Sequence, residues 1–197
     1  MTDPATLAAY DRAAAAYAED WHAQPAPADM HALLLEHFRP GPTADIGCGS
    51  GRDTDWLTRN GFPATGYDAA EGLLAEARRR YPGLAFHAAS LPDLDGVASG
   101  GFANVLCETV IMHLPAVRIA PAVRRLLALL APGGTLWLSW RPTAGSDRRD
   151  EADRLYTAFD AALVHDALGG AAILYENIGD SASSGKPVHR LILRRPG

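Results

Sequence analysis

The sequence predicts an α/β fold, a Rossmann-like three-layer sandwich in which helices cover both faces of a parallel sheet. Short apolar runs alternate with helical windows from residue 43 onward, and this alternation is typical of βαβ units. The composition, with 48% hydrophobic and 21% charged residues among 197, is that of a compact globular protein. We expect one domain over 1–197, with cap helices in 1–40, the core of the sheet in 43–140, and a helix and a strand hairpin in 141–197.

The N-terminal region predicts helices. Asp3 is a candidate N-cap, and Pro4 suits the first helical turn. Apolar and aromatic residues then recur at helical spacing, which indicates one amphipathic helix over Asp3–His22. A second helical pattern, with Met30 and Phe38 on one stripe, ends at the Pro-Gly-Pro sequence of residues 40–42.

The central region alternates between the two kinds of pattern. The expected strands are Thr43–Ile46, Ala64–Tyr67, Leu84–Ala88, Phe102–Cys107 and Thr135–Trp140. The expected helices are Arg52–Asn60, Glu71–Tyr81 and a third that ends at Ala131. Because proline lacks an N–H, we place Pro121 in the first turn of the third helix, which then begins near Ala120 after a short turn.

The last third is less regular. Arg141–Asp150 is polar and predicts a loop, whereas Glu151–Leu168 has a helical pattern. Two strand-like runs follow, Ala171–Tyr175 and Val188–Arg194, with a Ser/Gly turn at Gly179–Gly185 between them. We expect this pair to form a hairpin that closes one edge of the sheet.

Charge and apolar content disfavour several kinds of partner. The formal net charge of −5 argues against a nucleic-acid binder, which usually presents a basic face. No run reaches the 18 apolar residues of a membrane span, and the N-terminus lacks a signal-peptide pattern. We therefore expect a cytoplasmic protein whose partner is a small molecule, and neither a nucleic acid nor a membrane.

Minor residue types support the same interpretation. Cys48 and Cys107 are expected as reduced thiols, because a secreted scaffold would carry a larger set of cysteines. His, Cys and carboxylate residues show no metal-ligand spacing, so no metal is predicted. Lys186 is the only lysine and alanine is abundant, which we interpret as the bias of a GC-rich bacterial genome.

The most informative motif lies between the first core strand and its helix. It reads Asp45-Ile46-Gly47-Cys48-Gly49-Ser50-Gly51. Alternating glycines leave the backbone open to a ligand, and the following helix N-terminus offers free N–H groups. Asp68 follows Gly51 by 17 residues, at the end of the next strand, where an acid can accept hydrogen bonds from ribose hydroxyls. The pattern predicts a site for a cofactor with an adenosine moiety.

The residues around this motif discriminate between cofactors. The dinucleotide fingerprint requires glycine where this chain has Arg52. An NAD-dependent reductase would also need a Tyr-x-x-x-Lys pair, but Ala182 stands four residues before Lys186. No Gly-Lys-Ser/Thr follows the glycines, which disfavours a phosphate loop. Asp45 would repel a pyrophosphate but can hold the amino group of an amino acid, so the charges favour S-adenosylmethionine.

With these residues the chain resembles the class I S-adenosylmethionine-dependent methyltransferases from Tyr10 to Arg194. Asp45–Gly51 matches the family's acid-x-Gly-x-Gly-x-Gly loop, and Asp68 matches its ribose-binding acid. Further landmarks are Ser90-Leu91-Pro92, Phe102–Cys107, Met112-His113-Leu114 and Leu130–Gly134. The resemblance implies a seven-stranded, mostly parallel sheet with an antiparallel last strand.

The resemblance also implies a function. S-adenosyl-L-methionine would be the cofactor and S-adenosyl-L-homocysteine the product, and a small-molecule acceptor would receive the methyl group. We expect the reaction to be a tailoring step on a secondary metabolite or the modification of a small metabolite. The alternative is a non-catalytic or regulatory protein that binds S-adenosylmethionine and acts through a protein partner.

The residues expected to contact the cofactor come from the motif and from the resemblance. They are Asp45, Gly47, Cys48, Gly49, Gly51, Asp68, Ala69, Ala89, Ser90, Leu91, Cys107 and Tyr17. Many relatives use an acid just before the Ser-Leu-Pro segment to bind adenine, and residues 87–89 of this chain contain none. Backbone N–H groups near Ala89 and Ser90 are expected to take its place.

Three residues are candidates for contact with the methyl acceptor, to bind it, orient it or take a proton from it. The resemblance places His113 and Glu108 after the fourth strand, near the acceptor. A neutral imidazole at His113 could take a proton there, or the residue could simply cap the turn before Pro115. Glu108 could orient the acceptor. Arg141 either pairs with an acidic acceptor or is an exposed loop residue.

Overall fold

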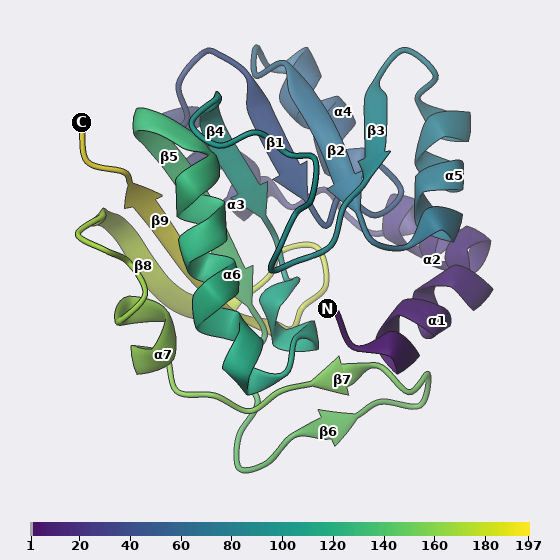
Figure 1. Ribbon diagram of the computed structural model, residues 1–197. Helices are drawn as coiled ribbons and strands as arrows, with labels where there is room; N and C mark the ends of the chain where they lie inside the picture. The colour runs from purple at the N-terminus through teal and green to yellow at the C-terminus, as the bar shows by residue number, and fades with distance from the viewer. Residues whose placement is uncertain (1) are drawn as a thin grey trace.

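A seven-stranded sheet forms the centre of the protein (Figure 1). The computed structural model describes residues 2–197, and Met1 lies outside the described residues. The strands are β1 (Thr43–Ile46), β2 (Ala64–Asp68), β3 (Ala85–Ala88), β4 (Phe102–Cys107), β5 (Leu130–Trp140), β8 (Ala172–Asp180) and β9 (Pro187–Arg194). Their order in the sheet is β3-β2-β1-β4-β5-β9-β8. β1 to β5 are parallel, and β9 is antiparallel to both of its neighbours, so the predicted fold class is confirmed.

Helices pack on both faces of this sheet (Figure 1). They are α1 (Pro4–Arg12), α2 (Ala14–Ala23), α3 (Ala28–His37), α4 (Arg52–Arg59), α5 (Glu71–Arg80), α6 (Ala116–Leu129) and α7 (Ala162–His165), with a 3₁₀ helix η1 (Ile111–His113). Val105 and Leu138 pack in the cluster that contains α6, whereas Leu106 and Trp137 of the same strands pack in the cluster that contains α3. Successive side chains of a strand point to opposite faces, so β4 and β5 supply both layers of core.

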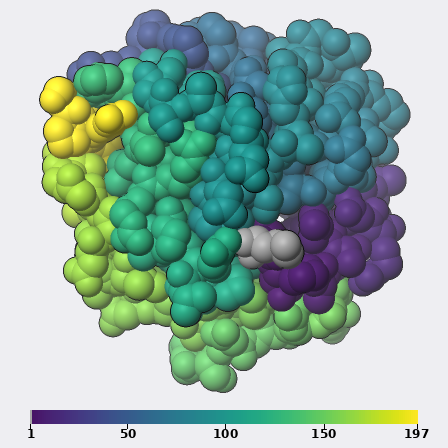
Figure 2. All heavy atoms as spheres, viewed as in Figure 1, coloured from purple at the N-terminus to yellow at the C-terminus, as the bar shows by residue number. Residues whose placement is uncertain are grey.

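The N-terminal segment forms two helices where the sequence predicts one. Asp3 is the N-cap as expected, because its Oδ2 accepts the Thr6 N–H at 2.9 Å. The helix breaks at Ala13, whose φ of −118° and ψ of 22° are not helical. Ala14 then packs with Ala70 and Leu73 at the start of α5. Figure 2 shows this segment, in purple, directly against the central region, in teal.

The start of α6 also differs from the prediction. The helix begins at Ala116, with Pro115 as N-cap, and Pro121 lies inside it. Pro121 cannot donate to the carbonyl of Val117, four residues earlier, but Val117 is 81% exposed, so water can reach this part of the helix. The helix buries Ile119 and Val123 completely, and this apolar face stabilises it despite the proline.

The predicted helix over Glu151–Leu168 is wrong for most of its length. Residues 148–156 form a small two-stranded sheet, β6 (Arg148–Arg149) with β7 (Leu155–Tyr156), and only the short α7 is helical. The Asp150 carboxylate accepts the N–H groups of Ala152 at 3.1 Å and Arg154 at 3.0 Å. Side-chain bonds of this kind compete with helix formation and favour a turn.

The C-terminal hairpin is confirmed. β8 and β9 pair antiparallel from Ala172↔Arg194 to Asp180↔Pro187, and β8 extends five residues beyond the predicted end. β5 also starts earlier than predicted, at Leu130. Among residues 2–197 no helix is both long and apolar enough to cross a membrane.

Candidate functional site

One cavity of about 210 Å³ opens at the carboxyl ends of the parallel strands. The segments that follow β1, β2, β3, β4 and β5 all contribute to its lining. Parallel strands end at the same edge of a sheet, and ligands of open α/β sheets bind at that edge. The N-terminal helices and the turn between β8 and β9 complete the wall.

The glycine-rich loop after β1 exposes its backbone to this cavity. Gly47 and Gly49 have φ values of +76° and +53°, a region that residues with a Cβ rarely adopt. A Cβ at Gly49 would lie 2.9 Å from Cζ3 of Trp21, and one at Gly47 would collide with Val110. The alternating glycines therefore permit both the turn and the close approach of side chains to it.

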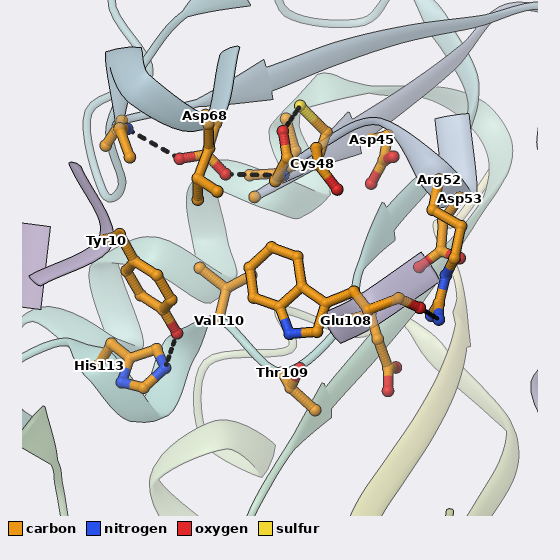
Figure 3. A pocket seen from close by; sticks show the side chains of 18 of the residues that line it. Tyr10, Asp45, Cys48, Arg52, Asp53, Asp68, Glu108, Thr109, Val110 and His113 are labelled. Carbon is orange, nitrogen blue, oxygen red and sulfur yellow. Dashed lines mark hydrogen bonds and ion pairs between the residues drawn. The ribbon is translucent and has the colours of Figure 1, made fainter. Parts of the chain in front are cut away.

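Asp68 ties this loop to the end of β2. Its Oδ2 accepts the Gly49 N–H at 2.9 Å, and its Oδ1 accepts the Ala70 N–H at 2.8 Å (Figure 3). Burial raises the pKa of the Asp68 carboxyl, and the backbone donors act in the opposite direction. The carboxyl group thus faces the cavity in a fixed orientation.

Asp45 lies at the inner end of the same loop and is 3% exposed. Its Oδ2 accepts the Thr54 hydroxyl at 2.6 Å. Burial, with the negative charge of Asp53 nearby, raises the pKa of the Asp45 carboxyl to about 8. A cation placed beside Asp45 would favour the ionised form, so the residue is a potential partner for an ammonium group.

Glu108 follows β4 and enters the cavity from the opposite side of the loop (Figure 3). Its Oε2 accepts both the Trp137 Nε1–H at 2.7 Å and the Ser139 hydroxyl at 2.5 Å. Among residues 2–197 no donor bonds its Oε1. Burial raises the pKa of this carboxyl. Glu108 therefore has one oxygen held by the protein and one left for a ligand.

Both ring nitrogens of His113 are engaged. Nδ1 lies 2.6 Å from the Leu155 carbonyl oxygen, which can only accept, so Nδ1 carries the proton. Nε2 then accepts the Tyr10 hydroxyl at 3.0 Å (Figure 3). Burial lowers the pKa of His113 to about 4, which keeps the ring neutral. The guanidinium of Arg154 lies over the ring of Tyr10, 5.3 Å from its centre, and so contacts the residue that bonds His113.

The cavity brings together most of the residues singled out from the sequence. Lining it are Asp45, Gly47, Cys48, Gly49, Asp68, Ala69, Ala89, Leu91, Glu108, His113 and Arg141. Gly51, Ser90, Cys107 and Tyr17 lie outside the lining. Cys107 is fully buried, and burial raises the pKa of its thiol well above the usual range. Tyr17 stacks behind the wall on Trp21, with ring centres 5.6 Å apart.

Of the two backbone N–H groups expected to bind adenine, that of Ala89 is already used within the protein. The Ala89 N–H already donates to the Asp68 carbonyl at 3.0 Å. The Ser90 side chain, by contrast, is tied to the N-terminal segment, because its hydroxyl bonds that of Thr2 at 2.7 Å. Ala89 extends the pairing of β2 and β3 by one residue, which explains why its N–H is used within the protein.

Some lining residues were not identified from the sequence. Gln24, Arg52 and the serines of the β8–β9 turn line the cavity. The Ser183 hydroxyl donates to Oε1 of Gln24 at 3.3 Å, across 159 residues of sequence. No local pattern predicts such a contact. Tyr10 and Trp21 were visible only as a helical aromatic stripe, which more often indicates packing.

Comparison of the sequence with known families places residues 44–134 in a family described as a methyltransferase domain. A trans-aconitate 2-methyltransferase of Sinorhizobium medicae is 37% identical over 123 residues, which are 60% of this chain and 44% of the relative. One from Methylobacterium nodulans is 37% identical over 102 residues, 49% of this chain and 37% of the relative. The chain thus spans less than half the length of these curated relatives.

A solved structure extends the similarity over almost the whole fold. The 1,6-didemethyltoxoflavin-N1-methyltransferase of Burkholderia thailandensis has a TM-score of 0.78 with this chain. The alignment covers 98% of this chain and 88% of that one, at 23% identity. That enzyme was crystallised with 1,6-didemethyltoxoflavin and S-adenosylhomocysteine. At this identity the likeness is one of fold.

Proposed function

We propose that this chain is a class I S-adenosylmethionine-dependent methyltransferase, since residues 44–134 match a methyltransferase-domain family, and that it transfers a methyl group from S-adenosylmethionine to a small-molecule acceptor. The observation that carries the proposal is the arrangement of two carboxyl groups around one glycine-rich loop. Asp45 and Asp68 lie at the ends of β1 and β2 and line the same cavity.

The residues present fit this cofactor. Asp68 would accept the ribose hydroxyls, the backbone of Gly47 and Gly49 would lie against the amino-acid moiety, and Asp45 would pair with its ammonium group. The loop itself requires glycine at these two positions, because a Cβ there would meet Val110 or Trp21. When bound, S-adenosylmethionine supplies an electrophilic methyl group on a sulfonium centre.

Glu108 is the candidate for contact with the acceptor. Trp137 and Ser139 fix its Oε2, which leaves Oε1 to accept a proton or a hydrogen bond from the nucleophile. Burial raises the pKa of Glu108, and this brings its proton affinity closer to that required of a general base at neutral pH. We propose His113 as a positioning residue, because its Nε2 lone pair is used by Tyr10.

The proposal extends to the type of reaction, the source and location of the protein, and the roles of its three segments. A tailoring step on a secondary metabolite, a bacterial source and a cytoplasmic location remain predictions from the sequence. The curated relatives that support a small-molecule acceptor come from bacteria. Within the chain, 1–40 would cap the cofactor, 43–140 would bind it, and 141–197 would contribute to the acceptor side.

Calorimetry with S-adenosylhomocysteine tests the proposal. We expect the wild-type chain to bind, and Asp68→Ala to bind at least about tenfold more weakly, because a carboxylate that accepts hydrogen bonds contributes about 1.5–3 kcal/mol. Asp95→Ala, at an exposed aspartate away from the cavity, is the matched control. Asp68→Asn keeps one acceptor oxygen and serves if the alanine variant does not fold.

Methyl transfer is then measured with trans-aconitate, small phenols, amines and thiols as acceptors. Transfer of a methyl group to any of these compounds would support the enzymatic function. Binding of S-adenosylhomocysteine without transfer to any compound would favour the non-catalytic alternative. Failure of the wild-type chain to bind S-adenosylhomocysteine would refute both functions.

A further inference from the structure

Arg141 occupies a defined place in the cavity wall. It is the first residue after β5 and lines the cavity with Glu108 and His113. Its positive charge is close enough to His113 to help keep the pKa of that ring low. Arg141 is therefore part of the site, although the sequence left open whether it would be an exposed loop residue.

The guanidinium of Arg141 has no partner within the part of the chain that the structure describes. Five arginines in residues 2–197 make neither a side-chain hydrogen bond nor an ion pair, namely Arg12, Arg39, Arg124, Arg141 and Arg148. The other four are exposed, and only Arg141 is partly buried. Its Nε is shielded from solvent and lacks a hydrogen-bond partner.

The other charged groups of the cavity do not compensate Arg141. Arg52, the second cation of the wall, donates to the Trp21 carbonyl at 2.9 Å and to Asp53 at 3.2 Å. Among the acids, Asp68 accepts hydrogen bonds from backbone N–H groups. Glu108 accepts hydrogen bonds from the Trp137 and Ser139 side chains of β5. No carboxylate oxygen of residues 2–197 lies within 4.0 Å of a nitrogen of Arg141.

A partly desolvated, unpaired guanidinium gains most from an anion that can use several of its donors. Burying a polar group without a hydrogen bond costs free energy, and the cost is larger for a charged group. The planar fork of arginine matches the two oxygens of a carboxylate. We propose that Arg141 binds a carboxylate of the methyl acceptor, so that the acceptors of this enzyme are small organic acids.

The sheet order separates this site from the cofactor's own carboxylate. Arg141 follows β5, whereas the glycine-rich loop follows β1, with β4 between them. Adjacent strands are about 4.8 Å apart, so the two segments start about 10 Å apart along the edge. The inference rests on the proposed function, since it assigns a substrate class to the same cavity.

The experiment measures binding to the 197-residue chain saturated with S-adenosylhomocysteine, by calorimetry. The probes are trans-aconitate and cinnamate, each with a neutral counterpart, trimethyl trans-aconitate or cinnamamide. We expect at least one acid to bind at least about tenfold more tightly than its neutral counterpart. Arg141→Gln should remove this preference, and Arg141→Lys, which keeps the charge without the fork, should retain part of it.

Arg124→Gln is the matched control, because Arg124 is exposed and unpaired but lies on α6 outside the cavity lining. It should bind the acids as wild type does. Circular dichroism checks that each variant is folded, and if Arg141→Gln does not fold, Arg141→Lys must weaken acid binding for the inference to stand.

Three outcomes would overturn the inference. They are equal affinity of the wild type and Arg141→Gln for the acids, failure of both acids to bind the wild type, and a loss of S-adenosylhomocysteine affinity in Arg141→Gln. The last would assign Arg141 to the cofactor. If the wild-type chain does not bind S-adenosylhomocysteine at all, the proposed function itself fails, and the inference fails with it.

Discussion

Asp45→Asn is expected to stabilise the ligand-free protein by an amount that grows with pH. The Asp45 carboxyl is 3% exposed, and burial together with the charge of Asp53 raises its pKa from 3.8 to about 8. The unfolded chain releases the proton near the ordinary pKa, whereas the native protein retains it to a higher pH. The native state therefore binds more protons between these two values, and its stability decreases as the pH rises through them.

The size of the effect follows from the shift. Each pH unit within this window costs the native state about 1.4 kcal/mol relative to the unfolded chain. At about pH 7 the accumulated cost is up to about 4 kcal/mol, and above about pH 8 it no longer grows. Asparagine does not titrate and can still accept the Thr54 hydroxyl, so the variant avoids the cost.

Urea unfolding of both proteins at several pH values between about 5 and 9 measures the difference. Other titrating groups cancel in the comparison, and the gap in unfolding free energy should widen by about 1.4 kcal/mol per pH unit before it levels off. Asp53→Asn, introduced into both proteins, should lower the pH at which the gap in unfolding free energy stops widening, because the charge of Asp53 helps raise the Asp45 pKa. Parallel curves for wild type and Asp45→Asn would refute the reasoning.

The same carboxyl links pH to ligand binding. An ammonium group beside Asp45 favours its ionised form, so binding of S-adenosylhomocysteine to the wild type should release a proton below about pH 8. Calorimetry in buffers of different ionisation enthalpy counts that proton. Asp45→Asn should release correspondingly fewer protons, and an identical count in the two proteins would contradict the pairing.

Gly49→Ala should destabilise the protein by about 1 kcal/mol more than Gly61→Ala in urea unfolding, since both glycines have positive φ but only a Cβ at Gly49 would meet Trp21. Equal losses would count against that contact. Nitrogen NMR of His113 should show a neutral ring protonated on Nδ1 from about pH 5 upward, because burial lowers its pKa to about 4; titration near the ordinary value would contradict this. Glu108→Gln should lower kcat at least about a hundredfold without weakening S-adenosylhomocysteine binding, and an unchanged kcat would leave Glu108 a structural role only.

The parts of the site that could be predicted are those encoded in short stretches of sequence. Gly47 and Gly49 adopt left-handed backbone conformations, and this requirement is visible directly as glycine at alternate positions. Asp68 was predictable because the spacing of one βαβ unit places it beside the loop. In both cases the signal and its structural cause lie within a few dozen residues.

The remaining parts depend on contacts between distant segments. Tyr10 reaches His113 across 103 residues, and His113 reaches Leu155 across 42. The sequence offered His113 as a candidate residue but not the two partners that occupy its ring nitrogens. The predicted helix over Glu151–Leu168 failed for a related reason, because the turn at Asp150 and the bond from the Leu155 N–H to the Thr6 hydroxyl determine the path of that segment.

The sheet order places four ionisable side chains in a row along the edge of the sheet. From β2 through β1 and β4 to β5, the strand ends carry or precede Asp68, Asp45, Glu108 and Arg141. At about 4.8 Å per strand the row spans about 14 Å. A ligand with hydroxyl and ammonium groups would find acceptors at the β2 and β1 end, and an anion would find the unpaired guanidinium of Arg141 beyond Glu108. Two ligands of opposite character would therefore be anchored at opposite ends of one cavity and would meet between them, and a transfer requires that their reacting atoms be held close together in this way.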